Sequence, residues 1–177
     1  MTVQMSNTSP WPYAAALFSA VLYEDVCVFA DTFADVDRSY FRRAGVVDRR
    51  YNPKLGSRVI RHLYAALNAT PGELHACELT TEEAHVIVLG CRGEYRELAL
   101  LLPAQKTRVG SIECSVPRET ETGSVRVIDL DKGTITTTRW VMQRQTRAAR
   151  LQFESPLDCA GPMLLEFPLS PMGRGQG

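Results

Sequence analysis

The spacing of hydrophobic positions changes near residue 73. Before that point apolar side chains recur three or four positions apart, and after it they alternate with polar ones. A 3.6-residue period is typical of amphipathic helices and a period of two is typical of strands. The pattern therefore predicts helices in the first part of the chain and strands in the second.

Three helices and one early strand are expected before residue 73. Pro12 in the first turn favours a helix over residues 10–22, for which a short hairpin is the competing interpretation. Thr32 and Asp35 resemble a capping box that begins a helix over 32–43. Ser57 is a suitable cap for a helix over 57–67. The apolar, β-branched run at 26–30 is expected to be a buried strand.

Seven strands joined by short polar turns are expected after residue 73. Their predicted ranges are 73–79, 85–90, 95–102, 109–116, 125–130, 135–143 and 148–153. Asp131, Lys132 and Gly133 have the composition of a three-residue hairpin loop with glycine in a left-handed conformation. Together the elements predict an α+β domain in which N-terminal helices pack on a mainly antiparallel, hairpin-linked β-sheet.

Both ends of the chain differ from this central part. Residues 1–12 are expected to be a leader, 13–156 a single α+β domain, and 157–177 an extended, Pro-containing C-terminal tail, because proline interrupts strand ladders. Exposed apolar side chains at both ends would need cover from another molecule. The residues expected to contact a partner are Trp11, Met163, Leu164, Leu165, Phe167 and Leu169.

Composition fits one ordinary domain. The chain has 177 residues, of which 45% are hydrophobic and 23% charged, and this excludes collagen-like, coiled-coil and disordered proteins. Its five cysteines are scattered and none forms a C-x-x-C pair, so we expect a reducing, intracellular and cytoplasmic location with no disulfide framework. The apolar run at 13–23 has no basic residue before it and ends at Glu24, unlike a signal peptide or a membrane span.

The net charge is zero, but the charges are unevenly distributed. Residues 1–37 contain no Lys or Arg, whereas 38–61 form a basic segment that also includes a loop leading into the helix predicted from Ser57. Such a loop favours an anion, and arginines interleaved with aromatic residues favour RNA. The candidate anion- or nucleic-acid-binding residues are Arg42, Arg43, Arg49, Arg50, Lys54, Ser57 and Arg58. The alternative is that neighbouring acids neutralise this segment within the fold.

His75, Cys77, His85 and Cys91 are the residues that most resemble a zinc-ligand set. If residues 80–83 form a loop, His85 pairs with Glu78, and alternation places His75 and Cys77 on one face of the sheet and His85 and Cys91 on the other. A one-residue register slip would bring the four together. We therefore expect no metal, no cofactor and no catalytic residue, with small buried thiols as the alternative role.

These observations predict a non-enzymatic structural or accessory subunit that mediates protein–protein contacts in a larger assembly. The alternative is an RNA- or phosphate-binding protein that uses the basic segment 38–61. An enzyme that uses Cys77 or Cys91 with a histidine is the least favoured hypothesis.

Overall fold

The computed structural model describes residues 2–5, 10–20, 22, 27–30, 47–48, 50–69, 72–115, 120–144 and 148–169. Its helices are α1 (Pro10–Ala20) and α2 (Leu55–Asn68). Strands β1 (Thr2–Met5) and β2 (Cys27–Ala30) form a separate parallel pair. The other strands form one sheet: β3 (His75–Cys77), β4 (Leu79–Thr80), β5 (Val86–Arg92), β6 (Arg96–Pro103), β7 (Thr107–Cys114), β8 (Thr122–Asp129), β9 (Ile135–Arg144), β10 (Ala149–Cys159) and β11 (Met163–Pro168).

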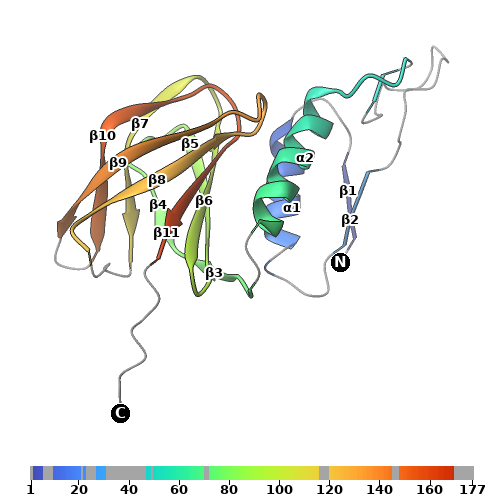
Figure 1. Ribbon diagram of the computed structural model, residues 1–177. Coiled ribbons are helices and arrows are strands. Elements are labelled where there is room, and N and C mark those ends of the chain that lie inside the picture. Colours follow the sequence, from blue (N-terminus) through green and yellow to red (C-terminus); the bar gives the residue numbers. More distant parts are fainter. Residues whose placement is uncertain are drawn as a thin grey trace.

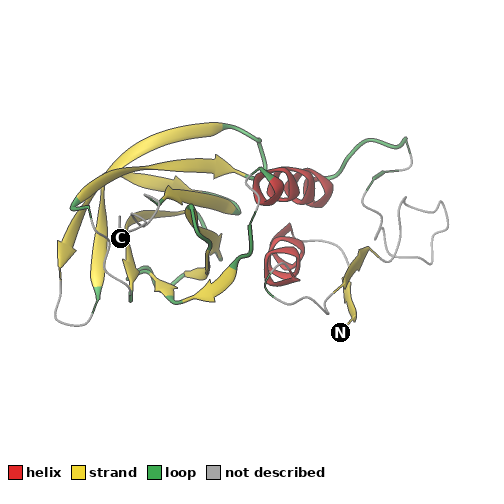
Figure 2. Ribbon diagram, turned by 60° about the horizontal axis from the view of Figure 1, so that its bottom comes forward, coloured by secondary structure: helices red, strands yellow, loops and turns green. Residues whose placement is uncertain are grey.

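This sheet is antiparallel and curls into a nearly closed barrel, with the strand order β3-β5-β6-β11-β8-β9-β10-β7-β4 (Figure 1). Residues 75–80 bring the two edges of the sheet together. Strand β3 pairs with β5 at one edge, and β4, which begins two residues after β3 ends, pairs with β7 at the other edge. Figure 2 shows the strands around an enclosed interior and both helices on one outer side.

Gly90 allows residues 75–80 to cross from one strand to the other. A Cβ atom at Gly90 would lie 2.6 Å from the Cys77 carbonyl oxygen and 2.8 Å from Leu79 Cγ. We expect Gly90→Ala to lower the free energy of unfolding by about 2–3 kcal/mol, because the backbone must move to relieve the overlap. Gly110→Ala is the control, since its nearest contact would be 3.7 Å away. Equal urea midpoints for the two variants would contradict this account of closure.

Two apolar cores lie on opposite sides of β6 and β11. Ala99, Leu101 and Leu165 point into the barrel interior, whereas Leu98, Leu100 and Leu164 point outward to the helices. Strands that are buried on both faces have continuous apolar runs in place of alternation. This explains the sequences of β6, RELALLLP, and β11, MLLEFP.

The helices form one layer over the outward core. Val59, Leu63 and Leu67, at helical spacing on α2, are buried against this face of the sheet together with Ala14 and Phe18 of α1. Burial of such side chains stabilises the layer by roughly 1.5–3 kcal/mol each. Within the ranges that the structure describes, no helix has the length and apolarity needed to cross a bilayer.

The predicted fold class is wrong, although the predicted antiparallel sheet is confirmed. The described chain is mostly β, and a nearly closed barrel with two helices replaces an α+β layer of helices on an open sheet. The connections differ as well. Hairpins join β5 to β6, β8 to β9 and β9 to β10. The connection from β6 to β7 is different: β6 pairs with β11 and β7 pairs with β10, so this connection crosses the barrel.

The extended C-terminal tail is also a wrong prediction. Residues 157–159 continue β10, and β11 lies within the sheet between β6 and β8. Met163, Leu164, Leu165 and Phe167 are at most 7% exposed. Pro162 and Pro168 flank or end the strand, where proline does not interrupt its ladder. The predicted domain boundaries, with a leader at 1–12 and a single domain at 13–156, stay predictions.

Three local predictions have different outcomes. The loop at 131–133 is confirmed, with Gly133 at φ 72° between β8 and β9. The cap at Ser57 is wrong, because α2 begins at Leu55 and the Ser57 hydroxyl donates a hydrogen bond to the Lys54 carbonyl. The predicted helix over 32–43 lies outside the described residues.

Candidate binding cleft between β9 and β10

Strands β9 and β10 separate halfway along their length. They pair only between residues 140–144 and 149–153. Beyond this point β10 bulges: from Gln152 to Leu157 it advances five residues while its partner β7 advances two. Pro156 lies in the bulge, where its missing N–H does not weaken a ladder. Residues 135–139 therefore pair with β8 on one side, and no described strand pairs with their other side.

The backbone of this half of β9 faces the gap at every second residue. Thr134 accepts a hydrogen bond from the Asp129 N–H, and the Met142 N–H donates to the Glu121 carbonyl, so even-numbered residues bond to β8. In an antiparallel strand the intervening residues point their N–H and C=O groups the other way. For Ile135 and Thr137 that direction is the gap left by β10.

Side chains from both strands line a cleft at the gap. Its cavity volume is about 260 Å³. Thr134, Thr136 and Thr138 of β9 share the face of the buried Trp140, so they point toward the barrel interior. The opposite wall is residues 155–158 of β10, and the apolar floor is Val127, Leu157 and Met163. The cleft is thus an opening of the barrel core, lined by hydroxyl groups above apolar side chains.

Two carboxylates, those of Asp129 and Asp158, also line the cleft. Asp129 accepts hydrogen bonds of 3.0 Å from the N–H groups of Asp131 and Lys132 and from the Lys132 ammonium. Burial raises the pKa of the Asp129 carboxyl, but these hydrogen bonds outweigh it and hold the pKa below its ordinary value. Asp158 pairs with Arg108 at 3.0 Å. Each carboxylate at the cleft therefore already has a cationic partner.

The Asp129→Asn variant tests the contribution of this carboxylate through the pH dependence of the free energy of unfolding. A carboxylate with a lowered pKa in the folded state contributes stability above its ordinary pKa of about 4, and that contribution disappears as the pH falls. We expect the substitution to lower the free energy of unfolding by about 1–2 kcal/mol at pH 7, and the difference from wild type to shrink below pH 4. Urea denaturation from pH 7 to pH 3 measures it, and a difference that is constant over this range would contradict the assignment.

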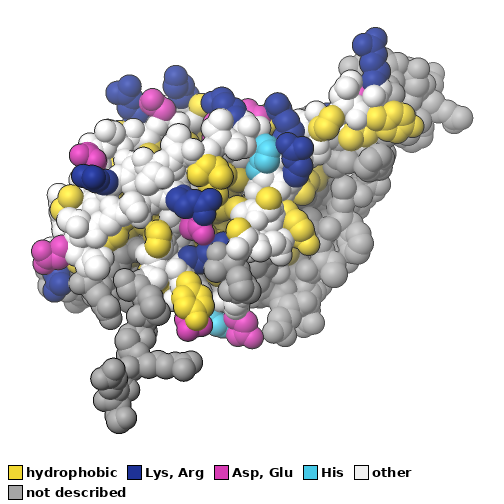
Figure 3. Space-filling view, in the orientation of Figure 1, with side chains coloured by type: hydrophobic (Ala, Val, Ile, Leu, Met, Phe, Trp, Pro, Cys, Tyr) yellow, Lys and Arg dark blue, Asp and Glu magenta, His cyan; other side chains and the backbone are white. Residues whose placement is uncertain are grey.

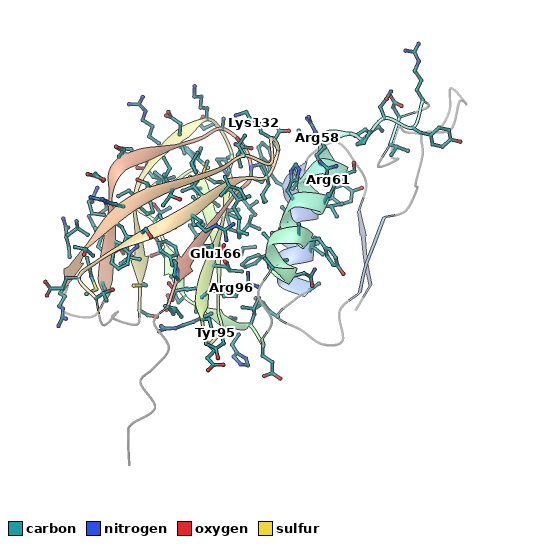
Figure 4. The ribbon with its side chains drawn as sticks, viewed as in Figure 1. Arg58, Arg61, Tyr95, Arg96, Lys132 and Glu166 are labelled. Carbon is teal, nitrogen blue, oxygen red and sulfur yellow. The ribbon has the colours of Figure 1, made fainter. Side chains whose placement is uncertain are left out.

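A buried arginine that the sequence analysis did not single out connects the helical layer to the sheet. Arg96 of β6 is 4% exposed and donates to the carbonyls of Ala66 and Leu67, at 2.8 and 2.5 Å, in the last turn of α2. It also lies 3.5 Å from Glu166, which Arg126 contacts at 2.6 Å. Figure 4 shows Arg96 and Glu166 together on the side of the sheet that faces α2. This cluster is structural and lies apart from the cleft.

The structure does not gather the predicted anion-binding residues into a described site. Arg42, Arg43 and Arg49 lie outside the described residues. Arg50 is exposed in a turn, Lys54 precedes α2, and Arg58 pairs with Asp131 at 2.9 Å. Figure 3 shows Lys and Arg side chains spread over the visible face with acidic ones between them. Arg150, another basic residue, is bonded to Glu82 and Glu113.

The candidate zinc ligands also lie apart. Cys77 packs against the barrel interior, whereas Cys91 is buried in the outward core. The predicted pairing of His85 with Glu78 is wrong, since β3 pairs His75 with Arg92 and Cys77 with Gly90. Burial raises the pKa of the Cys91 and Cys159 thiols to about 12. A thiol with so high a pKa is a poor nucleophile, so these two cysteines have a structural role.

Four of the six apolar residues assigned to a partner belong to this chain's own core. Met163, Leu164, Leu165 and Phe167 are buried, and Trp11 and Leu169 are half-buried. Burial of the first four removes the reason for expecting them at an interface, and the expectation for Trp11 and Leu169 stays a prediction. The cleft was missed because its residues come from four strands, and only the interruption at Pro156 marks it in the sequence.

Comparison with known proteins gives a fold likeness and no family. No family model matches the chain, and no curated protein does. Among solved structures, 88% of the chain matches 27% of a cycloisomaltooligosaccharide glucanotransferase from Paenibacillus sp., with a TM-score of 0.54 and 8% identity. A family 30 subfamily 8 xylanase from Clostridium acetobutylicum matches over 96% of this chain and 42% of its own length, with a TM-score of 0.52 and 10% identity. The chain therefore spans less than half the length of these enzymes.

Proposed function

We propose that this chain is a non-enzymatic accessory subunit that mediates protein–protein contacts in a larger assembly. The observation that carries the proposal is the interruption between β9 and β10, which directs backbone hydrogen-bonding groups of residues 135–139 at an open cleft. Unpaired strand edges are sites of association between chains.

The alternatives have less support. In the basic segment 38–61, the alternative site for RNA or phosphate, Ser57 and Arg58 already bond to the Lys54 carbonyl and to Asp131, and Arg42, Arg43 and Arg49 lie outside the described residues. An enzyme that uses Cys77 or Cys91 with a histidine needs a reactive thiol, and burial raises the pKa of the Cys91 thiol to about 12.

Cross-linking in the native cells tests the proposal, because the chain has only three lysines. Lys132 follows Asp129 of the cleft, and Lys106 lines a small cavity with Asp158, which also lines the cleft. Lys54 lies before α2 and is the internal control. The proposal expects one reproducible partner protein cross-linked to Lys106 and Lys132 and absent from Lys54. A chain that fractionates at its monomer mass without intermolecular cross-links would overturn it.

A further inference from the structure

Apart from Arg139, the open half of β9 lacks the features that protect natural strand edges. Edges are usually shielded by charged residues, proline or bulges. Residues 135–138 are Ile-Thr-Thr-Thr, which have high β-propensity and carry no charge. The side chain of Ile135 is 55% exposed. The other wall of the gap, by contrast, has the bulge, Pro156 and Asp158. Of the two walls, β9 is the one suited to accept a new strand.

The length and depth of the gap match an extended peptide. Residues 135–139 span about 17 Å at 3.4 Å per residue, enough to pair with about five residues of another strand. The cavity of about 260 Å³ is slightly smaller than the roughly 300–1,000 Å³ of small-molecule sites. It can receive side chains that project from a strand, which is how a strand added to a sheet edge gains specificity.

On these grounds we propose that the cleft binds an extended segment of a partner protein, which adds a β-strand to residues 135–139 of β9. The inference rests on the proposed function and specifies its mode of contact. Main-chain hydrogen bonds to Ile135 and Thr137 supply affinity. Inward side chains of the segment meet the apolar floor and the hydroxyl groups of Thr136, Thr138 and Ser155, so small apolar and small polar residues are favoured at alternate positions.

Three variants separate the parts of this site. Thr136→Arg fills the cleft, because Thr136 points inward. Thr137→Pro removes a backbone N–H that faces the gap and leaves the ladder to β8 intact. Thr137→Arg is the matched control, since it places the same bulk on the outer face of the same strand and keeps the backbone N–H.

The probe is a synthetic, fluorescein-labelled peptide from a random 12-residue phage-display selection against the full chain. We expect Thr137→Pro to weaken its binding about ten-fold, the effect of one hydrogen bond, and Thr136→Arg to weaken it more. Thr137→Arg should stay within about two-fold of wild type. N-methylation of alternate peptide residues should abolish binding for one set of positions and not for the other. This last pattern needs no protein variant, so it stands even if a variant misfolds.

Several results would overturn the strand proposal. The first is a selection that yields no peptide whose binding Thr136→Arg weakens. The others are equal peptide binding by all variants and tolerance of N-methylation at every peptide position. Binding of maltoheptaose or xylohexaose that Thr136→Arg abolishes would also overturn it, in favour of a carbohydrate ligand. If the native partner still cross-links while the peptide experiment fails, the proposed function stands and only this mode of contact is wrong.

Discussion

Replacement of Arg96 by alanine is expected to cause the largest loss of stability, about 3–5 kcal/mol in the free energy of unfolding. Its guanidinium bonds to the carbonyls of Ala66 and Leu67 and lies beside Glu166. Without it, the Leu67 carbonyl at the negative end of the helix loses this bond, the Ala66 carbonyl keeps only the Ala69 N–H at 3.3 Å, and the buried Glu166 carboxylate keeps only Arg126. Helix α2 has no basic residue in its own last turn, so no other cation of the helix replaces this contact.

Urea denaturation monitored by circular dichroism measures the loss, and two further variants identify its cause. Arg126→Ala removes the other partner of Glu166, but the Arg126 side chain is 45% exposed, and we expect a loss of about 1 kcal/mol or less. Arg96→Lys keeps the charge without the planar fork and is expected to fall between the two. Equal losses for Arg96→Ala and Arg126→Ala would show that the helix carbonyls do not depend on Arg96.

Proline substitution at two adjacent threonines is expected to have very different effects. The Thr136 N–H bonds to β8, so Thr136→Pro removes a ladder bond and is expected to destabilise the chain by about 2–3 kcal/mol. The Thr137 N–H faces the gap, and Thr137→Pro is expected to cost less than about 1 kcal/mol. The pair has the same residue type, the same strand and similar exposure, so intrinsic propensity cancels between them.

Thermal and urea denaturation of both variants test the gap without any ligand. Thr136→Ala and Thr137→Ala control for the loss of the side chain and are expected to differ by less than about 0.5 kcal/mol. Similar destabilisation by the two prolines would mean that Thr137 also bonds to a neighbouring strand. The cleft would then be closed, and the proposed docking site would be lost with it.

Local periodicity was sufficient to predict most strands and both described helices. Strands β8 and β9 alternate clearly because one face is buried and the other exposed, and the glycine turn between them fixes the hairpin. Helix α2 carries its buried residues at three- and four-residue spacing. These signals lie within a few residues of one another, so the sequence shows them directly.

The long-range arrangement could not be predicted in the same way. Strand β11 is buried on both faces, so it lacks alternation, and its flanking prolines resemble those of a linker. The pairing of β6 with β11 joins residues more than sixty positions apart, and no local pattern encodes it. The expectation of an exposed tail, and of partner contacts through it, followed from missing this strand.

The candidate site was missed for a related reason. Thr136 and Ser155 become neighbours of one cleft only because β10 bulges away from β9. The Ser-Pro pair at 155–156 was visible in the sequence, but it signals a local interruption and does not say which strand loses its partner. In the sequence, Arg96 resembles the polar end of a strand. Its role depends on the carbonyls of α2, which come within reach of its guanidinium only in the folded chain.

Residue-resolved hydrogen exchange of β9 tests most directly whether the barrel is open at the cleft. The amides of Thr136 and Thr138 are expected to be protected by their bonds to β8, and those of Val141 and Gln143 by their bonds to β10. The amides of Ile135 and Thr137 are expected to exchange at least about a hundred-fold faster than their even-numbered neighbours. Equal protection of odd and even residues across 135–138 would contradict the open cleft and every role assigned to it.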